Sequence, residues 1–227
     1  MNASIVRAKL FAGDRPTLLT AVVTTLLAVV VWVGVAVPGT APLVQELDDS
    51  WRGLMAAREW APFVVLAQVF ALVGGVWVTV PLRIVVALWL WQRRRWTQFW
   101  VWVLAVVPAQ AVTSLGKYLY NRPRPGDGLG QAMTASYPSG HATNAAVIAL
   151  ALVFILIPPG SRRTWLIMAV GYALVMAWTR TYLRMHWLSD VTGGFLWGTS
   201  CALWAARLEP RVMESRHSST IESESTS

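Results

Sequence analysis

Histidine and acidic side chains are rare in the apolar part of the chain, and near its end one of each lies four residues apart. Residues 60–208 contain two histidines and two acidic residues, among them His186 and Asp190. Positions i and i+4 share one face of a helix, so the Asp190 carboxylate can accept a hydrogen bond from the His186 ring. That bond leaves the other ring nitrogen free and more basic. We therefore interpret residues 179–190 as a catalytic segment.

A basic run at residues 117–125 has the composition of a phosphate-binding segment. Its two Arg-Pro steps, at Arg122 and Arg124, stiffen an extended stretch that presents guanidinium groups. Arginine forks match phosphate oxygens bidentately, and Lys117 adds a mobile point charge. Taken alone, the run is also compatible with a loop that contacts lipid headgroups.

A Pro-Ser-Gly-His sequence at residues 138–141 predicts a tight turn that opens a helix. Free backbone N–H groups and the positive end of the helix dipole can hold an anion at such a turn. Ser139 can donate its hydroxyl to the anion or cap the helix. His141, in the first helical turn, lies beside the bound group as a candidate acid. Alone, it is equally compatible with an interfacial histidine that has no role.

A third group combines Arg180 with the histidine and aspartate of the catalytic segment. Arg180 and His186 are six residues apart, so one continuous helix would not place them on the same face, and we expect a bend across residues 181–185. Asp190 lies within or at the mouth of an apolar run, where an ionisable residue is a candidate functional residue. The alternative is a structural pair, His186 with Asp190, that ties two helices together.

Membrane-spanning helices are the elements that must position these side chains. Hydrophobic residues make up 56% of the 227 residues, which argues against a soluble globular domain. Apolar runs of about 20 residues match the ~30 Å hydrocarbon core when they are helical. We predict an all-α integral membrane bundle of six transmembrane helices, at residues 17–37, 61–91, 97–115, 142–157, 164–179 and 188–206.

The second run, 61–91, is long enough for one kinked helix or for two short spans, and the basic clusters decide between them. With a single span there, four clusters fall on one side: the basic residues of the N-terminal segment, Arg93–Arg95, Arg162–Arg163 and Arg207. The positive-inside rule makes that side the cytoplasm. We therefore predict six spans with both termini cytoplasmic, in the plasma or inner membrane.

In the two outer loops at 116–141 and 179–186, topology gives no role to five basic residues: Lys117, Arg122, Arg124, Arg180 and Arg184. A site that collects an anionic group is the simplest explanation for them. Because the other basic residues occupy short loops between apolar runs, the net charge of +8 does not indicate nucleic-acid binding.

Residues 1–207 form one membrane domain in this interpretation. Residues 208–227 are rich in Ser, Thr and Glu and predict a disordered cytoplasmic tail. Residues 43–60 have apolar side chains at helical spacing, which predicts a short interfacial amphipathic helix or a solvated connector. The single cysteine, Cys201, excludes a disulfide framework and a thiolate metal site within one chain.

Taken together, the three motifs resemble the signature of the type 2 phosphatidic acid phosphatase (PAP2) superfamily of membrane lipid phosphatases. They read Lys-x6-Arg-Pro at 117–125, Pro-Ser-Gly-His at 138–141 and Arg-x5-His-x3-Asp at 180–190. Vanadium haloperoxidases and bacterial acid phosphatases share this signature. The resemblance covers about residues 60–206 and includes the six-span arrangement.

The match has one departure and one ambiguity. The third motif usually begins Ser-Arg, whereas Thr179 precedes Arg180 here and keeps a hydroxyl donor. The first motif offers two Arg-Pro steps, of which the family spacing selects Arg124 and leaves Arg122 auxiliary.

The resemblance implies a role for each motif residue. His186 attacks phosphorus and carries a phosphohistidine intermediate, Asp190 orients its ring, and His141 protonates the leaving oxygen and later activates water. The phosphoryl oxygens are held by Lys117, Arg124, Ser139, the Gly140 N–H and Arg180. No cofactor or metal is implied, because fixed cations take the role of Mg²⁺.

We therefore expect a metal-independent lipid phosphatase with its site on the outer membrane face. Its substrate would be an isoprenyl diphosphate such as undecaprenyl diphosphate, or phosphatidate or phosphatidylglycerol phosphate. Phosphotransfer to a lipid or sugar acceptor is an alternative, and so is a non-catalytic protein that binds or transports lipid headgroups. In each case the partners are the bilayer and its lipid phosphates, not nucleic acid.

Overall fold

Helices make up most of residues 3–130 and 134–207, the ranges that the computed structural model describes. Eight α-helices and one short 3₁₀ helix occur in those ranges, without a strand. They are α1 (Ala3–Ala36), α2 (Ala41–Ala57), α3 (Ala61–Val73), α4 (Val76–Gln92), α5 (Trp96–Tyr120), α6 (Gly140–Leu156), η1 (Pro159–Ser161), α7 (Arg162–Tyr182) and α8 (Leu188–Ala206). The all-α prediction is confirmed, while the tail expected at 208–227 lies outside the described residues.

All six predicted apolar runs are helical. Among the described residues, three stretches are long and apolar enough to cross a membrane, namely Thr17–Ala36, Ala61–Gln92 and Trp96–Tyr120. The other three runs form α6, α7 and α8. Buried side chains occur along the whole of α6 and α8, which pack against each other more extensively than any other pair. These two helices therefore contact protein on most sides, which explains why small and polar residues interrupt their apolar sequence.

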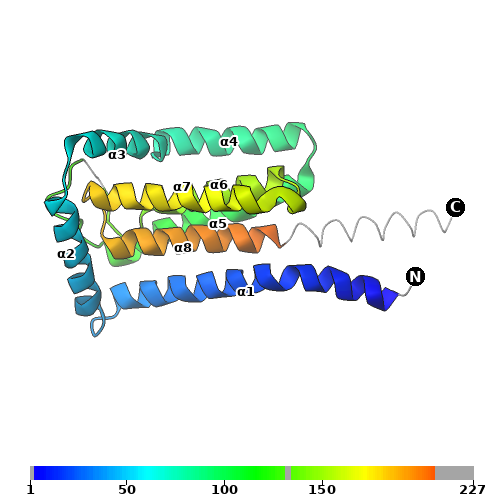
Figure 1. The fold of residues 1–227 in the computed structure, drawn as a ribbon, viewed down its shortest axis with the longest axis horizontal. Helices are drawn as coiled ribbons and strands as arrows, with labels where there is room; N and C mark the ends of the chain where they lie inside the picture. Colours follow the sequence, from blue (N-terminus) through cyan, green and yellow to red (C-terminus); the bar gives the residue numbers. More distant parts are fainter. Residues whose placement is uncertain (1–2, 131–133, 208–227) are drawn as a thin grey trace.

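The second run forms one line of helix with a break in it. α3 ends at Val73 and α4 begins at Val76, and the two continue one another along one side of the bundle (Figure 1). At the break the Gly75 N–H donates to the Leu72 carbonyl at 3.1 Å. The Ala71 carbonyl, which a regular helix would pair with that N–H, is therefore free for another donor. This arrangement agrees with one kinked element rather than two antiparallel ones.

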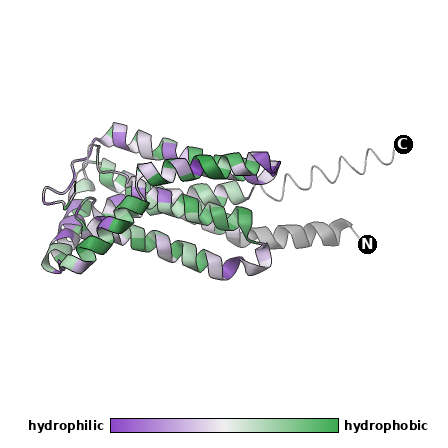
Figure 2. Ribbon diagram, turned by 90° about the horizontal axis from the view of Figure 1, so that it is seen from above, coloured by the Kyte–Doolittle hydropathy of each residue, from purple (hydrophilic) through white to green (hydrophobic). Residues whose placement is uncertain are grey.

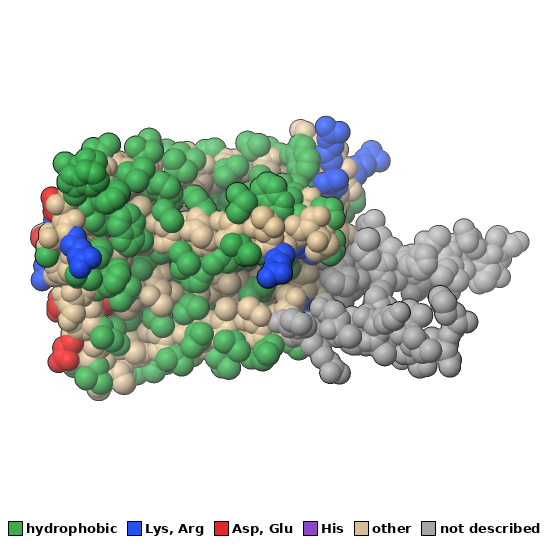
Figure 3. Space-filling view, in the orientation of Figure 1, with side chains coloured by type: hydrophobic (Ala, Val, Ile, Leu, Met, Phe, Trp, Pro, Cys, Tyr) green, Lys and Arg blue, Asp and Glu red, His purple; other side chains and the backbone are tan. Residues whose placement is uncertain are grey.

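The connections between helices divide between two ends of the bundle. The α1–α2 turn, the chain between α5 and α6, and the α7–α8 turn lie at one end, and the α4–α5 and α6–α7 turns lie at the other (Figure 1). Hydrophilic residues concentrate at the first end (Figure 2). Hydrophobic side chains cover the long side between the ends, and charged side chains gather toward the ends (Figure 3). This distribution is typical of a membrane protein.

The amphipathic helix predicted within residues 43–60 is present as α2, which lies across the first end of the bundle (Figure 1). Leu43 and Leu47 are exposed, whereas Met55 and Asp48 are buried. A buried carboxylate requires partners from the bundle below it.

Close packing of α6 against α8 depends on glycine. A Cβ at Gly198 would overlap the carbonyl oxygen of Thr143 and lie 3.0 Å from the Ala146 Cβ. A Cβ at Gly194 would lie 2.6 Å from the Ser139 carbonyl oxygen. Small residues of this kind allow helix backbones to approach closely in membrane proteins.

We predict that Gly198→Ala destabilises the protein by about 1–3 kcal/mol, because the added methyl must displace backbone atoms of α6. Thermal unfolding in detergent measures this effect. Gly171→Ala is the matched control, since a Cβ at Gly171 in α7 would meet nothing within 4 Å. Equal melting temperatures for the two variants would contradict the proposed close approach.

Candidate active site

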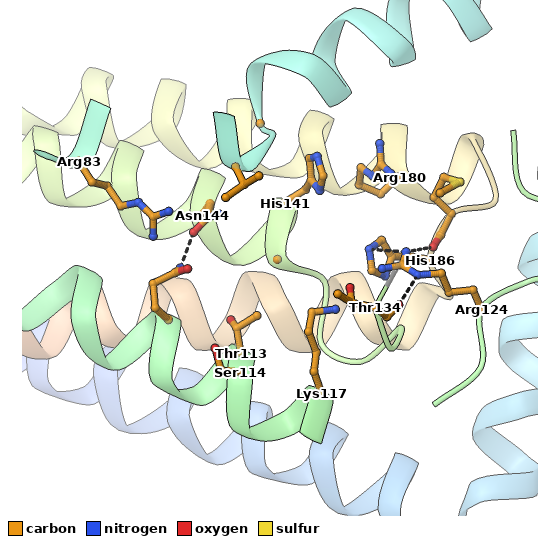
Figure 4. A pocket seen from close by; sticks show the side chains of 15 residues that line it. Arg83, Thr113, Ser114, Lys117, Arg124, Thr134, His141, Asn144, Arg180 and His186 are labelled. Carbon is orange, nitrogen blue, oxygen red and sulfur yellow. Dashed lines mark hydrogen bonds between the residues drawn. The ribbon is translucent and has the colours of Figure 1, made fainter. Parts of the chain in front are cut away.

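A cavity of about 440 Å³ lies among the α3–α4 break, α5, α6, α7 and the turn that follows α7. Six of the residues predicted from the motifs line it: Lys117, Arg124, Gly140, His141, Arg180 and His186. Figure 4 shows the labelled side chains of this set around one shared space. The three motifs, which are far apart in the sequence, therefore meet at one site.

His186 lies in the short turn between α7 and α8. α7 continues to Tyr182 and α8 begins at Leu188, so the bend occupies residues 183–187 and begins two residues later than expected. Arg180 remains on the last turn of α7, and the bend brings His186 back to the same cavity.

The His186 ring contacts the Asp190 carboxylate, as the spacing predicted. Nδ1 of His186 lies 3.4 Å from Oδ2 of Asp190. The same oxygen accepts the Trp187 N–H at 2.9 Å and the Ser136 hydroxyl. An ionised carboxylate only accepts hydrogen bonds, so this contact places a proton on Nδ1 and the lone pair on Nε2.

The second ring nitrogen is not free, because Nε2 of His186 lies 3.0 Å from Nη1 of Arg124. A guanidinium group has only donors, so Nε2 accepts this hydrogen bond. Burial lowers the pKa of His186 well below its ordinary value, and the charges of Arg124, Arg180 and Lys117 lower this pKa further. The ring is therefore neutral at neutral pH, with its lone pair directed at a cation.

Arg122 binds the other oxygen of Asp190, at 2.8 Å from Nη1. The same Nη1 donates to the Ser189 hydroxyl at 2.7 Å, and Nη2 donates to Asp48 at 2.7 Å. Arg122 does not line the cavity. The structure thus places this auxiliary residue behind the carboxylate, where it contacts Asp190 instead of the space open to a phosphate.

Asp48 was missed by the sequence interpretation. Its carboxylate is 1% exposed and accepts the Ser189 N–H at 2.8 Å and the Ser189 hydroxyl at 2.6 Å, in addition to Arg122. These bonds connect α2 to the first turn of α8, which carries Asp190.

A signal for Asp48 exists in the sequence. It falls at helical spacing with Val44, Trp51 and Met55, on the face of α2 that turns toward the bundle. A carboxylate on that face must have a buried cationic or hydrogen-bonding partner.

His141 is held by the break between α3 and α4. Its Nε2 lies 3.0 Å from the Ala71 carbonyl oxygen, the group that the break leaves without a helical partner. A carbonyl only accepts, so Nε2 carries the proton of this bond and Nδ1 is the nitrogen that can exchange a proton with a ligand. A Cβ at Gly74 would lie 3.0 Å from Cδ2 of His141, so the break and the ring are also in steric contact.

The remaining predicted residues differ in how they face the cavity. Lys117 lines it and donates to the Ala135 carbonyl, and Arg180 lines it with a buried Nε that has no partner in the described part of the chain. Ser139 is buried, and its hydroxyl likewise lacks a partner there. Thr179 is not part of the lining, because its hydroxyl donates to the Met176 carbonyl at 2.7 Å.

Arg184, which had no predicted role, holds the His186 turn in place. Its Nη2 lies 2.8 Å from Glu59 and its Nε lies 3.0 Å from Asp127. The residue has a positive φ of 51°, which an arginine adopts only when its surroundings require it. The ion pairs connect the turn to the α2–α3 connection and to the chain that follows α5.

Comparisons with known proteins place the three motifs within a matched region. The family model described as PAP2 superfamily matches residues 98–214. The putative undecaprenyl-diphosphatase YbjG of Escherichia coli (strain K12) is 30% identical over 167 residues, which cover 69% of this chain and 79% of that protein.

Two solved structures share the fold. A transmembrane PAP2-type phosphatidylglycerolphosphate phosphatase from Bacillus subtilis matches with a TM-score of 0.73 at 19% identity, over 85% of this chain and 97% of that one. LpxE of Aquifex aeolicus matches with a TM-score of 0.59 at 24% identity, over 71% of this chain and 95% of that one.

We predict that Asp48→Asn lowers kcat for phosphate release about 10- to 100-fold, with a small change in KM. The substitution removes a charge-assisted hydrogen bond of about 1.5–3 kcal/mol that orients Arg122 and, through it, Asp190. Steady-state kinetics on purified protein, with a melting curve for each variant, measure this effect.

Asp49→Asn is the matched control, because its carboxylate is 50% exposed and pairs with Arg52 on the surface of α2. An Asp48→Asn variant with wild-type kcat would show that α2 does not position the pair His186 and Asp190.

Proposed function

The chain belongs to the PAP2 superfamily of phosphatases, and we propose that it hydrolyses a lipid diphosphate at the outer membrane face through a phosphohistidine on His186. The observation that carries this proposal is the meeting of His186, His141 and the three cationic motif residues Lys117, Arg124 and Arg180 at one cavity.

In the proposed first step, Nε2 of His186 attacks phosphorus and the bond from phosphorus to the leaving oxygen breaks. In this structure the Arg124 guanidinium contacts Nε2 at 3.0 Å. When substrate binds, this guanidinium donates to the phosphoryl oxygens instead, which frees the Nε2 lone pair. Phosphorylation makes the ring cationic, and Asp190 stabilises that charge through Nδ1. Two observations support attack by Nε2: the His186 ring is neutral, and its Nδ1 lies 3.4 Å from the Asp190 carboxylate.

His141 has the complementary role in the proposal. The negative charge of the bound diphosphate favours the His141 ring with a proton on both nitrogens. Its Nδ1 then donates a proton to the leaving oxygen, and later accepts one from the water that attacks phosphohistidine. The Ala71 carbonyl supports this role because it binds Nε2–H and directs the other nitrogen to the reaction.

The phosphoryl oxygens are held by fixed donors. Lys117, Arg124 and Arg180 supply the positive charge that a divalent metal supplies in many phosphoryl-transfer enzymes. Ser139 adds a buried hydroxyl that has no partner among the described residues, and Gly140 adds its backbone N–H.

The substrate class follows from the lipid phosphatase family. The name of the Escherichia coli relative favours an isoprenyl diphosphate such as undecaprenyl diphosphate over phosphatidate or phosphatidylglycerol phosphate. The fold match to the Bacillus subtilis phosphatase supports a lipid-facing site, while its 19% identity carries no information on the headgroup.

We predict that His186→Gln lowers phosphate release by at least about 10³-fold, because no other group can form the covalent intermediate. The assay uses a panel of lipid phosphates and diphosphates in detergent with a chelator present, and a rapid quench traps acid-labile phosphoenzyme in wild type. His217→Gln, which changes the third histidine of the chain, is the control. Full activity of His186→Gln would refute the covalent mechanism, and loss of wild-type turnover in chelator would refute metal independence.

For topology we propose six spans in the plasma or inner membrane. Both termini lie in the cytoplasm, and the active site opens on the extracytoplasmic side. The α4–α5 and α6–α7 turns, with Arg93–Arg95 and Arg162–Arg163, lie at one end of the bundle (Figure 1). The positive-inside rule assigns that end to the cytoplasm.

Cysteine labelling tests this topology. Gly39 and Gly160 lie in turns at opposite ends, and a Cβ at either meets nothing within 4 Å. In a Cys201→Ser background, we expect a membrane-impermeant maleimide to label Gly39→Cys in intact cells and Gly160→Cys only after permeabilisation. The reverse pattern would invert the orientation.

A further inference from the structure

The active-site cavity extends well beyond the residues that the proposed reaction uses. Arg124 and His186 lie at one end of it, Arg83 and Asn144 lie at the other, and His141 lies between them (Figure 4). Gln110, which binds Asn144, also lines the far end. The motifs include none of these three far-end residues.

Arg83 is a cation in the middle of α4, within the apolar stretch Ala61–Gln92. A charge at such a position is costly and commonly marks a functional site. Its Nε donates to the Thr79 carbonyl at 2.9 Å, which directs the guanidinium toward the cavity. Among the side chains described, those of residues 17–130 and 134–207, no carboxylate pairs with Arg83, so its two NH2 groups are available to a ligand.

The neighbouring amides add further hydrogen-bonding capacity. Nε2 of Gln110 donates to Oδ1 of Asn144 at 2.6 Å. This bond occupies the acceptor of Asn144 and leaves its NH2 group as a donor. The far end of the cavity therefore presents a guanidinium and an amide N–H, which match the oxygens of an anion.

The proposed reaction determines which part of the substrate reaches that end. Attack by His186 and departure of the leaving group are roughly in line, on opposite sides of phosphorus. His141 lies on the leaving side, so the leaving group extends past His141 toward Arg83 (Figure 4). For a lipid monophosphate the leaving group is a neutral alcohol, whereas for a lipid diphosphate it is an anionic lipid phosphate.

We infer that Arg83, with Gln110 and Asn144, binds the leaving phosphate of a lipid diphosphate and makes the enzyme selective for diphosphates over monophosphates. This inference rests on the proposed function. In the reaction, the bond from the bridging oxygen to the terminal phosphorus breaks and that oxygen keeps the electron pair. Arg83 stabilises the negative charge that develops on the departing phosphate. A monophosphate has no leaving phosphate, so Arg83 favours the diphosphate alone.

The test compares a prenyl diphosphate with the prenyl monophosphate of the same tail, in wild type and in Arg83→Gln. We expect wild type to prefer the diphosphate, and Arg83→Gln to lower the ratio of the two kcat/KM values about 10- to 100-fold. Arg93→Gln is the matched control, because this exposed arginine follows the same helix. Gln110→Glu is a second variant, in which a carboxylate repels the leaving phosphate and lowers the same ratio.

The outcomes separate this inference from the proposed function. An unchanged ratio in both Arg83→Gln and Gln110→Glu would overturn the leaving-phosphate site, and so would a wild-type preference for the monophosphate, while the phosphohistidine mechanism would stand. Wild-type protein that released phosphate from neither lipid would instead refute the proposed function. Melting curves confirm that each variant is folded, and the ratio is insensitive to the fraction of active protein.

Discussion

The fully buried carboxylate of Asp190, at the start of α8, must be surrounded by hydrogen-bond donors, because a buried charge without partners is strongly destabilising. Asp190 meets this condition with hydrogen-bond donors from Arg122, Ser136, Trp187 and His186. They belong to the chain after α5, the segment before α6 and the turn before α8. The contacts that make the buried charge tolerable therefore also assemble the site.

The cationic side chains that line the cavity need hydrogen-bond acceptors or negative charge beside them. Lys117, Arg124 and Arg180 face one another across it, and their mutual repulsion opposes folding. Part of this cost is offset by acceptors within the chain, since Lys117 and Arg124 donate to backbone carbonyls and Arg124 donates to His186. A bound phosphoryl group would supply the missing negative charge. Side chains arranged before the substrate arrives need little reorganisation during the reaction.

The break between α3 and α4 illustrates how an irregularity in a membrane helix becomes useful. Non-helical backbone at membrane depth is tolerated where it is buried in protein or lines a cavity, and both conditions hold at Gly74. The carbonyl freed at Ala71 binds His141. Beyond the break, α4 brings Arg83 to the far end of the same cavity.

The sequence alone determined the helical class, the apolar runs and six of the residues that line the cavity, because hydrophobic length, rare ionisable residues and motif spacing are local properties. It also predicted the contact of His186 with Asp190, since the two are four positions apart. Only the tertiary structure revealed Asp48 behind Arg122, the Arg124 contact on Nε2, the Ala71 carbonyl against His141 and Arg83 opposite His186. Each of these joins segments distant in the chain, and their distances depend on how the helices pack, which no local pattern records.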